Sequence, residues 1–162
     1  MNQLLEYRTK LIDRLESVAE EFRAGCLQVN EPFTAVEEGG WNTHQLASHT
    51  RDVDKVAYGM RIRRTAEENN PEFQNFDADE WIAANYDSDE PLAFILDELS
   101  ASVKETASML RQLPPEAWTR ESSHVVYGGG FTLQIWVERG LAHIQEHLDT
   151  VKKATVHDSS QT

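Results

Sequence analysis

Apolar residues recur every three or four positions through four long segments of this chain, residues 3–28, 42–68, 91–112 and 132–153. This spacing places the apolar side chains on one face of an α-helix and leaves the charged residues on the other. Helices of this kind bury their apolar faces by packing against one another. The sequence therefore predicts an all-α protein, a four-helix bundle.

Several helix boundaries carry recognisable start signals. Asn42 is a good N-cap, and Gln45 stands where the side chain of a capping box reaches back to the cap. Thr132 is placed to cap the last helix, and either Ser88 or Asp89 to cap the third. These signals predict where the second, third and fourth helices begin.

Length and composition fit one folded unit. With 162 residues, 40% of them hydrophobic, we expect a single domain over residues 1–154 and a flexible tail over residues 155–162. The N-terminus has no basic start followed by an apolar run, and the lone cysteine, Cys26, cannot form an internal disulfide. Both observations favour a cytoplasmic protein, with Cys26 an ordinary core or surface residue.

Negative charge is concentrated in the middle of the chain. The net charge is -13, and residues 67–105 hold 12 acidic residues against the single Lys104, a local excess of 12 - 1 = 11. Such a surface repels phosphate backbones and anionic lipids, and the short basic cluster Arg61, Arg63 and Arg64 does not offset it. We expect no nucleic-acid partner, no membrane association and a small-molecule substrate.

Two histidines of the last helix form a candidate metal-binding pair. His143 and His147 are four residues apart, which stacks their side chains on one face of the helix beside its apolar ridge. This spacing is a common way for two imidazoles to bind one metal ion. Gly140, one turn earlier, is expected to leave space above them. Burying unpaired imidazoles is costly, and a metal ion would satisfy both.

His49 supplies a third imidazole from the inward face of the second helix. At about 1.5 Å rise per residue, His49 reaches the level of His143 and His147 when the second and fourth helices are antiparallel. The long connection over residues 69–90 permits this, since the third helix can then run parallel to the second. We predict an up-down-down-up bundle with a crossover between helices two and three.

The other histidines are not expected to bind the metal. His44 lies five residues before His49, about 140° around the helix, and so faces away from the site. His157 falls in the predicted tail. His124 lies in a loop before the glycine run, where we expect a surface position, with the mouth of the pocket as the alternative.

Three motifs in order and spacing resemble the DinB-like superfamily over about residues 4–153. They are Trp41 before a capped helix containing LASHTRDVD, PPEAW after the third helix, and FTLQIWVERGLAHIQEHLDTV in the last helix. The resemblance implies a metal site at His49, His143 and His147 in a bundle with the same crossover. It also implies frequent homodimers and activities that include thiol-dependent transfer or isomerisation and metal-dependent hydrolysis.

Three neutral imidazoles leave a divalent ion an open coordination position, as in catalytic sites, and zinc and nickel both suit such ligands. Our hypothesis is a metal-dependent enzyme that acts on a small molecule, by hydrolysis or by S-transfer with a low-molecular-weight thiol as cofactor. Asp52 and Glu146 are expected to be solvated charges, and no catalytic acid or base is assigned. Two alternatives stay open: a non-catalytic metal-binding dimeric bundle acting as a binding or stress-response protein, and three core histidines hydrogen-bonded without metal.

Overall fold

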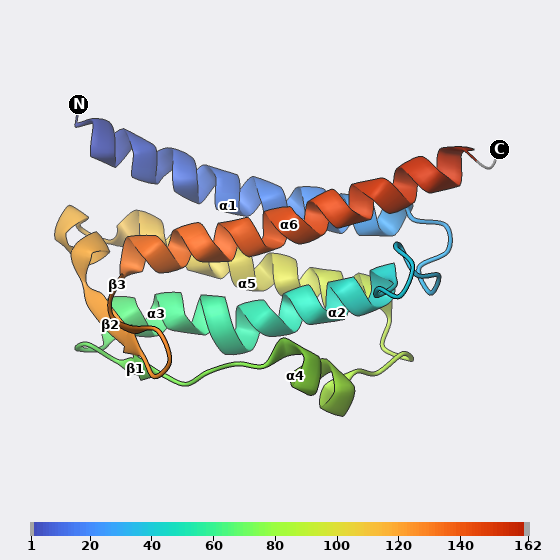
Figure 1. Cartoon of the computed structure of the whole chain (residues 1–162). Coiled ribbons are helices and arrows are strands. Elements are labelled where there is room, and N and C mark those ends of the chain that lie inside the picture. The colour runs from blue at the N-terminus through green and yellow to red at the C-terminus, as the bar shows by residue number, and fades with distance from the viewer. Residues whose placement is uncertain (1, 161–162) are drawn as a thin grey trace.

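The computed structural model describes residues 2–160, with side chains through Thr155, and its long helices lie side by side (Figure 1). The first is α1 (Gln3–Gln28). The second is a continuous rod made of α2 (Thr43–Val53), a π-helical segment (Asp54–Tyr58) and α3 (Gly59–Glu67). The third and fourth are α5 (Leu92–Gln112) and α6 (Leu133–Ser160).

The order of directions along the bundle is the predicted one. In Figure 1, α1 and α6 run one way, whereas the α2–α3 rod and α5 run the other way. The rod is therefore antiparallel to α6, and the up-down-down-up topology is confirmed. The long connection after α3 returns along the outside of the bundle to the start of α5, which allows the rod and α5 to be parallel.

The predicted N-cap residue is confirmed for the second and fourth helices and wrong for the third. Asn42 accepts a hydrogen bond from the backbone N–H of Gln45, and the Gln45 side chain accepts one from the backbone N–H of Asn42, which completes the capping box. Thr132 Oγ1 accepts from the backbone N–H of Ile135 at 3.3 Å. The prediction of Ser88 or Asp89 as the cap of α5 was wrong, because that helix begins directly after Pro91 with no side-chain cap.

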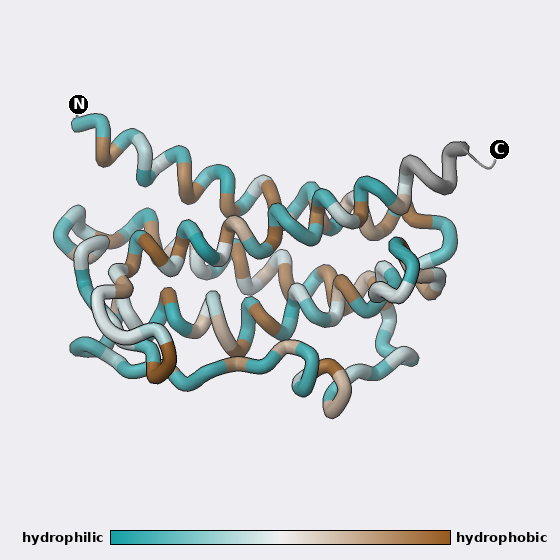
Figure 2. The backbone as a smooth tube through the Cα atoms, viewed as in Figure 1, coloured by the Kyte–Doolittle hydropathy of each residue, from teal (hydrophilic) through white to brown (hydrophobic). Residues whose placement is uncertain are grey.

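The core is made of buried apolar residues from all four long helices. Figure 2 shows hydrophobic and hydrophilic positions alternating along each of these helices. Phe22, Leu99, Trp136 and Leu148 are each no more than 1% exposed. Cys26 belongs to this core, and burial raises the pKa of its thiol to about 12. A thiol with such a pKa remains protonated and unreactive at neutral pH.

The connection between α3 and α5 contains β1 (Glu72–Phe73) and the short helix α4 (Ala78–Asn85). Side-chain hydrogen bonds hold this connection against the α2–α3 rod. The Trp81 indole N–H donates to Asp52 at 3.1 Å, and Asp52 also accepts from Arg51. The expectation that Asp52 is a solvated charge was therefore wrong, because the connection covers that face of α2.

A small three-stranded sheet closes one end of the bundle and was not predicted. β1 pairs in parallel with β2 (Glu121–His124), which pairs antiparallel with β3 (Gly128–Thr132). Gly128 and Gly130 have φ of +87° and +82°, values that favour glycine, and both lie in β3 directly after the hairpin turn at residues 125–127. A 3₁₀ turn (Pro115–Thr119) leads from α5 into this sheet.

The last helix is longer than its sequence pattern indicates. α6 continues to Ser160, beyond the end near Ala154 that we expected, and residues 161–162 of the predicted tail lie outside the described residues. Whether residues 155–162 are flexible stays a prediction. Within residues 2–160, none of the helices combines the length and the apolar character needed to span a bilayer.

Candidate metal centre

The three predicted histidines meet at one point between the rod and α6. The Nε2 atom of His49 lies 3.1 Å from that of His143 and 3.1 Å from that of His147, and the last two are 3.0 Å apart. Of the His, Cys, Asp and Glu side chains described, these form the cluster able to hold a metal ion. The predicted convergence of these three imidazoles is confirmed, and we call this cluster the histidine triangle.

Aromatic neighbours hold the imidazole rings in place. The Trp41 ring lies 4.7 Å from the His49 ring, and the Tyr58 ring lies 5.3 Å from the His143 ring, between centroids. Tyr58 occupies the space that Gly140 was expected to leave empty, because a Cβ atom at Gly140 would lie 3.4 Å from the Tyr58 Cβ. Gly140 therefore leaves no open space above the histidines.

Burial keeps the three imidazoles neutral. It lowers the pKa of His49 to about 4 and that of His143 to about 2, with the neighbouring imidazoles acting in the same direction. The pKa of His147 is also lowered, by burial first. A neutral imidazole offers a lone pair to a metal, so at pH 7 these three rings can bind an ion without first losing a proton.

The spacing of the triangle fits a divalent ion. Three nitrogens about 3.1 Å apart surround a centre that is 3.1/√3, or about 1.8 Å, from each of them. Zinc–imidazole bonds are about 2.0–2.1 Å long, so His49, His143 and His147 are close enough together to hold one such ion between them. Three protein ligands are typical of catalytic zinc sites, whereas structural sites usually have four.

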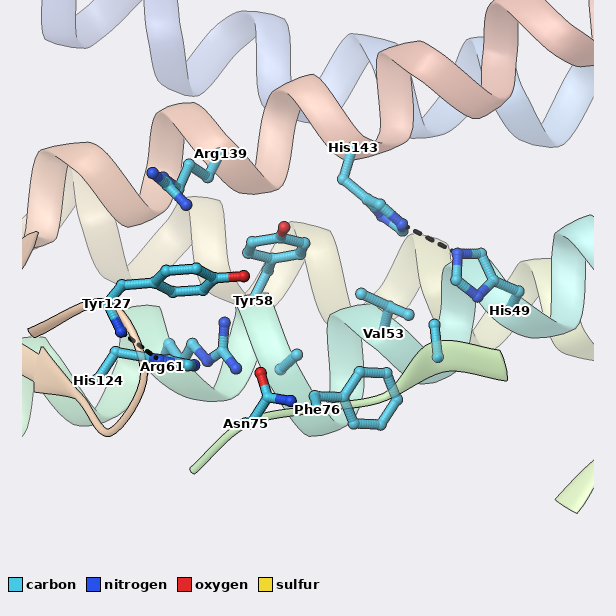
Figure 3. Close-up of a pocket in the computed structure, with 12 residues that line it drawn as sticks. His49, Val53, Tyr58, Arg61, Asn75, Phe76, His124, Tyr127, Arg139 and His143 are labelled. Carbon is cyan, nitrogen blue, oxygen red and sulfur yellow. Dashed lines mark hydrogen bonds between the residues drawn. The ribbon is translucent and has the colours of Figure 1, made fainter. Parts of the chain in front are cut away.

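A cavity of about 210 Å³ opens beside His49 and His143 (Figure 3). His124 lines it and is 2% exposed, so the expected surface position was wrong and the alternative, the pocket mouth, was right. The hairpin of β2 and β3 buries this side chain. Arg61 and Arg139 also line the cavity, and sequence reasoning missed both. Arg61 lies on the same helix face as His49 and Val53, because these positions are separated by multiples of four residues. That spacing could have predicted that Arg61 faces the cavity.

The other candidate neighbours lie away from the triangle. His44 is buried beneath the connection, where its Nδ1 lies 2.7 Å from the Tyr86 hydroxyl and its Nε2 lies 2.7 Å from the Glu90 carbonyl. It faces away as predicted, and it is a hydrogen-bonded core residue. Glu146 is exposed, as expected, and His157 has no described side chain.

Comparison with known proteins agrees with this architecture. A family model described as the DinB superfamily matches residues 12–151. The chain belongs to the DinB superfamily. Its fold resembles that of YfiT from Bacillus subtilis, with a TM-score of 0.84 at 20% identity over 95% of this chain and 89% of that one. The YfiT structure is titled as an inferred metal-dependent hydrolase with an unusual four-helix bundle topology.

A second similar protein comes from Oceanobacillus iheyensis. OB0782, named as an inferred metal-dependent hydrolase, is 31% identical over 114 residues, which is 68% of this chain. The match spans 65% of the length of that relative.

Proposed function

We propose that this DinB protein is a metal-dependent hydrolase of a small molecule, with zinc or nickel held by His49, His143 and His147. The convergence of three neutral imidazole nitrogens within 3.1 Å of one another carries this proposal. Two similar proteins, OB0782 and YfiT, have names that describe metal-dependent hydrolases and support the same reaction class.

The surrounding residues prepare the site for this chemistry. A divalent ion bound there supplies Lewis-acid polarisation and lowers the pKa of water, the two functions that metal-dependent hydrolysis requires. His49 comes from the rod, and His143 and His147 from α6, so the site also depends on the packing of these helices. Trp41 and Tyr58 flank the imidazoles, limit their rotation and exclude bulk solvent from one side.

The cavity beside His49 and His143 supports a small substrate. Its volume of about 210 Å³ equals about seven water molecules at roughly 30 Å³ each. This volume is below the usual range for sites that enclose a drug-sized ligand, about 300–1,000 Å³. We infer that the reacting part of the substrate is compact.

The experiment begins with metal analysis of protein purified without a histidine tag and reconstituted with zinc or nickel. We expect one ion per chain and at least a hundredfold loss of affinity in His143→Ala, since a three-ligand site becomes a two-ligand site. Glu146→Gln, on an exposed position between two of the ligands, is the matched control and should retain the ion. Substoichiometric metal in the wild type, or unchanged affinity in His143→Ala, contradicts the proposal.

Turnover is tested on a panel of small esters and amides, with and without metal. Metal-dependent hydrolysis that is lost in His49→Ala while the helical circular dichroism signal persists supports the enzyme. Metal binding without turnover of any panel member would favour a non-catalytic bundle.

A further inference from the structure

The cavity beside the histidine triangle has an unusual charge for this protein. The chain carries 28 acidic and 15 basic side chains, excluding histidine. Among the described residues that line the cavity, however, Arg61 and Arg139 are basic and none is acidic. Figure 3 shows both arginines on the same side of the cavity, away from His49. One end of the cavity is therefore positive inside an acidic molecule.

Arg61 is buried there without a carboxylate partner. It is 6% exposed, and none of the ion pairs among the described residues includes it. One terminal nitrogen donates to the Gln74 carbonyl at 3.2 Å, while its Nε has no hydrogen-bond partner among the described residues. A buried, unpaired charge is costly, which points to a partner that the chain itself does not provide.

Aromatic rings hold the Arg61 side chain in position. Its guanidinium carbon lies 4.9 Å from the centre of the Trp136 ring, 5.9 Å from that of Tyr58 and 6.0 Å from that of Phe73. These cation–π contacts offset part of the cost of burial, but they supply no hydrogen-bond acceptor. The guanidinium is thus held in place before any ligand arrives.

Two more side chains complete this end of the cavity. Backbone N–H groups of Val126 and Tyr127 donate to His124 Nδ1 at 3.1 and 3.3 Å. The hydrogen of neutral His124 is therefore on Nε2, which makes this ring a donor. Arg139 is exposed at the mouth and near enough to lower the pKa of both Arg61 and His124, after burial as the main cause. All three groups are donors.

We propose that Arg61, Arg139 and His124 form an anion subsite that binds the carboxylate or phosphate group of the substrate while the bond to be hydrolysed lies at the histidine triangle. This assignment rests on the proposed hydrolase function, and it narrows the substrate class to small organic anions. Tyr58 stands between the two ends, because its ring contacts both His143 and Arg61. A guanidinium matches either oxyanion, since it presents paired donors to two oxygens.

Binding of anions to metal-free protein tests the subsite without depending on catalysis. Chelator-treated wild-type protein is titrated by calorimetry with succinate and, separately, with inorganic phosphate. We expect saturable binding of at least one, and the stronger ligand identifies the oxyanion class. Loss of a charged hydrogen bond corresponds to about a tenfold or larger decrease in affinity, which we expect for Arg61→Gln. Arg139→Gln should weaken binding severalfold, since its guanidinium is more exposed.

Arg64→Gln is the matched control. Arg64 lies on the same helix and over the same Phe73 ring as Arg61, but it pairs with Glu68 and does not line the cavity. Binding should be unchanged in this variant. If Arg61→Gln does not fold, the exposed Arg139→Gln decides the question. Equal binding by wild type and Arg139→Gln, or by wild type and folded Arg61→Gln, overturns the subsite, as does no binding to the wild type.

A second measurement uses zinc-loaded protein and two esters with the same leaving group, 4-nitrophenyl hemisuccinate and 4-nitrophenyl acetate. The ratio of kcat/KM for the charged ester to that for the neutral ester should fall about tenfold in Arg61→Gln and stay constant in Arg64→Gln. Failure of the two proposals can be distinguished. Anion binding without metal uptake leaves the subsite standing and rejects the hydrolase, whereas turnover with an unchanged ratio rejects the subsite alone.

Discussion

The Nε2 atoms of His49 and His147 lie 3.1 Å apart although 98 positions separate these residues in the sequence. The antiparallel packing of the rod against α6 brings them together. The same packing buries both rings, so the energetics of the site are tied to the stability of the bundle. Proton binding is the first place where this link can be measured.

Metal-free protein should lose stability as the pH falls below neutrality. In the unfolded chain a histidine pKa is about 6.5, whereas folding lowers those of His49 and His143 to about 4 and about 2. Between these values the unfolded state binds protons that the folded state excludes. The contribution of these imidazoles to the free energy of unfolding should therefore be constant above pH 7 and decrease below about 6.5, by up to about 1.4 kcal/mol per pH unit for each imidazole. Urea denaturation from pH 7.5 to 4.5 measures this slope.

His49→Gln provides the control for that pH dependence, because it removes one titrating ring while keeping a polar side chain. Its stability should depend less steeply on pH than that of the wild type over pH 6.5–4.5. An identical slope in both proteins would show that other groups, such as carboxylates, cause the acid sensitivity.

Two glycines should respond to alanine in opposite directions. A Cβ atom at Gly59 would lie 2.6 Å from the Asp54 carbonyl oxygen, because the π-helical segment directs that carbonyl toward it. Gly59→Ala should destabilise by about 1–3 kcal/mol. At Gly140 the nearest atom is 3.4 Å away, an ordinary contact, so Gly140→Ala should stabilise by about 0.5–1 kcal/mol. Urea denaturation of the pair checks the prediction, and effects of equal sign would contradict it.

Arg51 should contribute more stability than an exposed arginine. It contacts Asp52, Glu90 and Glu98 at 2.7–3.1 Å and is 12% exposed, so its removal leaves three carboxylates close together. We expect Arg51→Met to cost about 2–4 kcal/mol at pH 7.

The comparison for Arg51 is Arg23→Met. Arg23 binds Asp97 at 2.7 Å, but it is 38% exposed, and an exposed pair contributes at most about 1 kcal/mol. Chemical denaturation of both variants in the same buffer gives the difference. Similar losses in the two would show that the Arg51 cluster adds no more than a surface ion pair.

Ser122 should couple the small sheet to α6. Its hydroxyl accepts from the buried Trp136 indole N–H at 2.7 Å and donates to the part-buried Phe131 carbonyl at 2.9 Å. Ser122→Ala leaves the buried indole N–H unpaired and should cost about 1–3 kcal/mol. Ser123→Ala, at the neighbouring and less buried position, should change stability by less than about 0.5 kcal/mol. A thermal melt compares them, and equal melting temperatures would disprove the coupling.

The sequence predicted the features that depend on local periodicity. Apolar spacing located the four long helices, and the His143–His147 spacing with the inward position of His49 located the histidine triangle. The crossover was predicted because the three imidazoles can lie at the same position along the bundle axis only if the second and fourth helices are antiparallel. These inferences succeed because the regular geometry of an α-helix determines, from sequence spacing alone, which face of the helix a side chain lies on and how far along the helix axis it lies.

Features that depend on distant backbone pairing were not predictable in the same way. Glu72 pairs with Ser123 across about fifty residues in a two-residue strand, too short for any alternating pattern. The burial of His124 follows from that sheet, so it was missed as well. Arg61 was assigned to a surface basic cluster, because charge suggests exposure and only the packed structure reveals the surrounding aromatic rings.

The connection between α3 and α5 serves two purposes. Besides letting the rod and α5 run in the same direction, it contributes Asn75, Phe76 and Ala78 to the wall of the cavity, and none of these three belongs to the bundle core. A change at these positions can thus alter which molecules enter while leaving the imidazoles and the interior packing as they are. In this architecture, selectivity can diverge without rebuilding the scaffold that holds the ion.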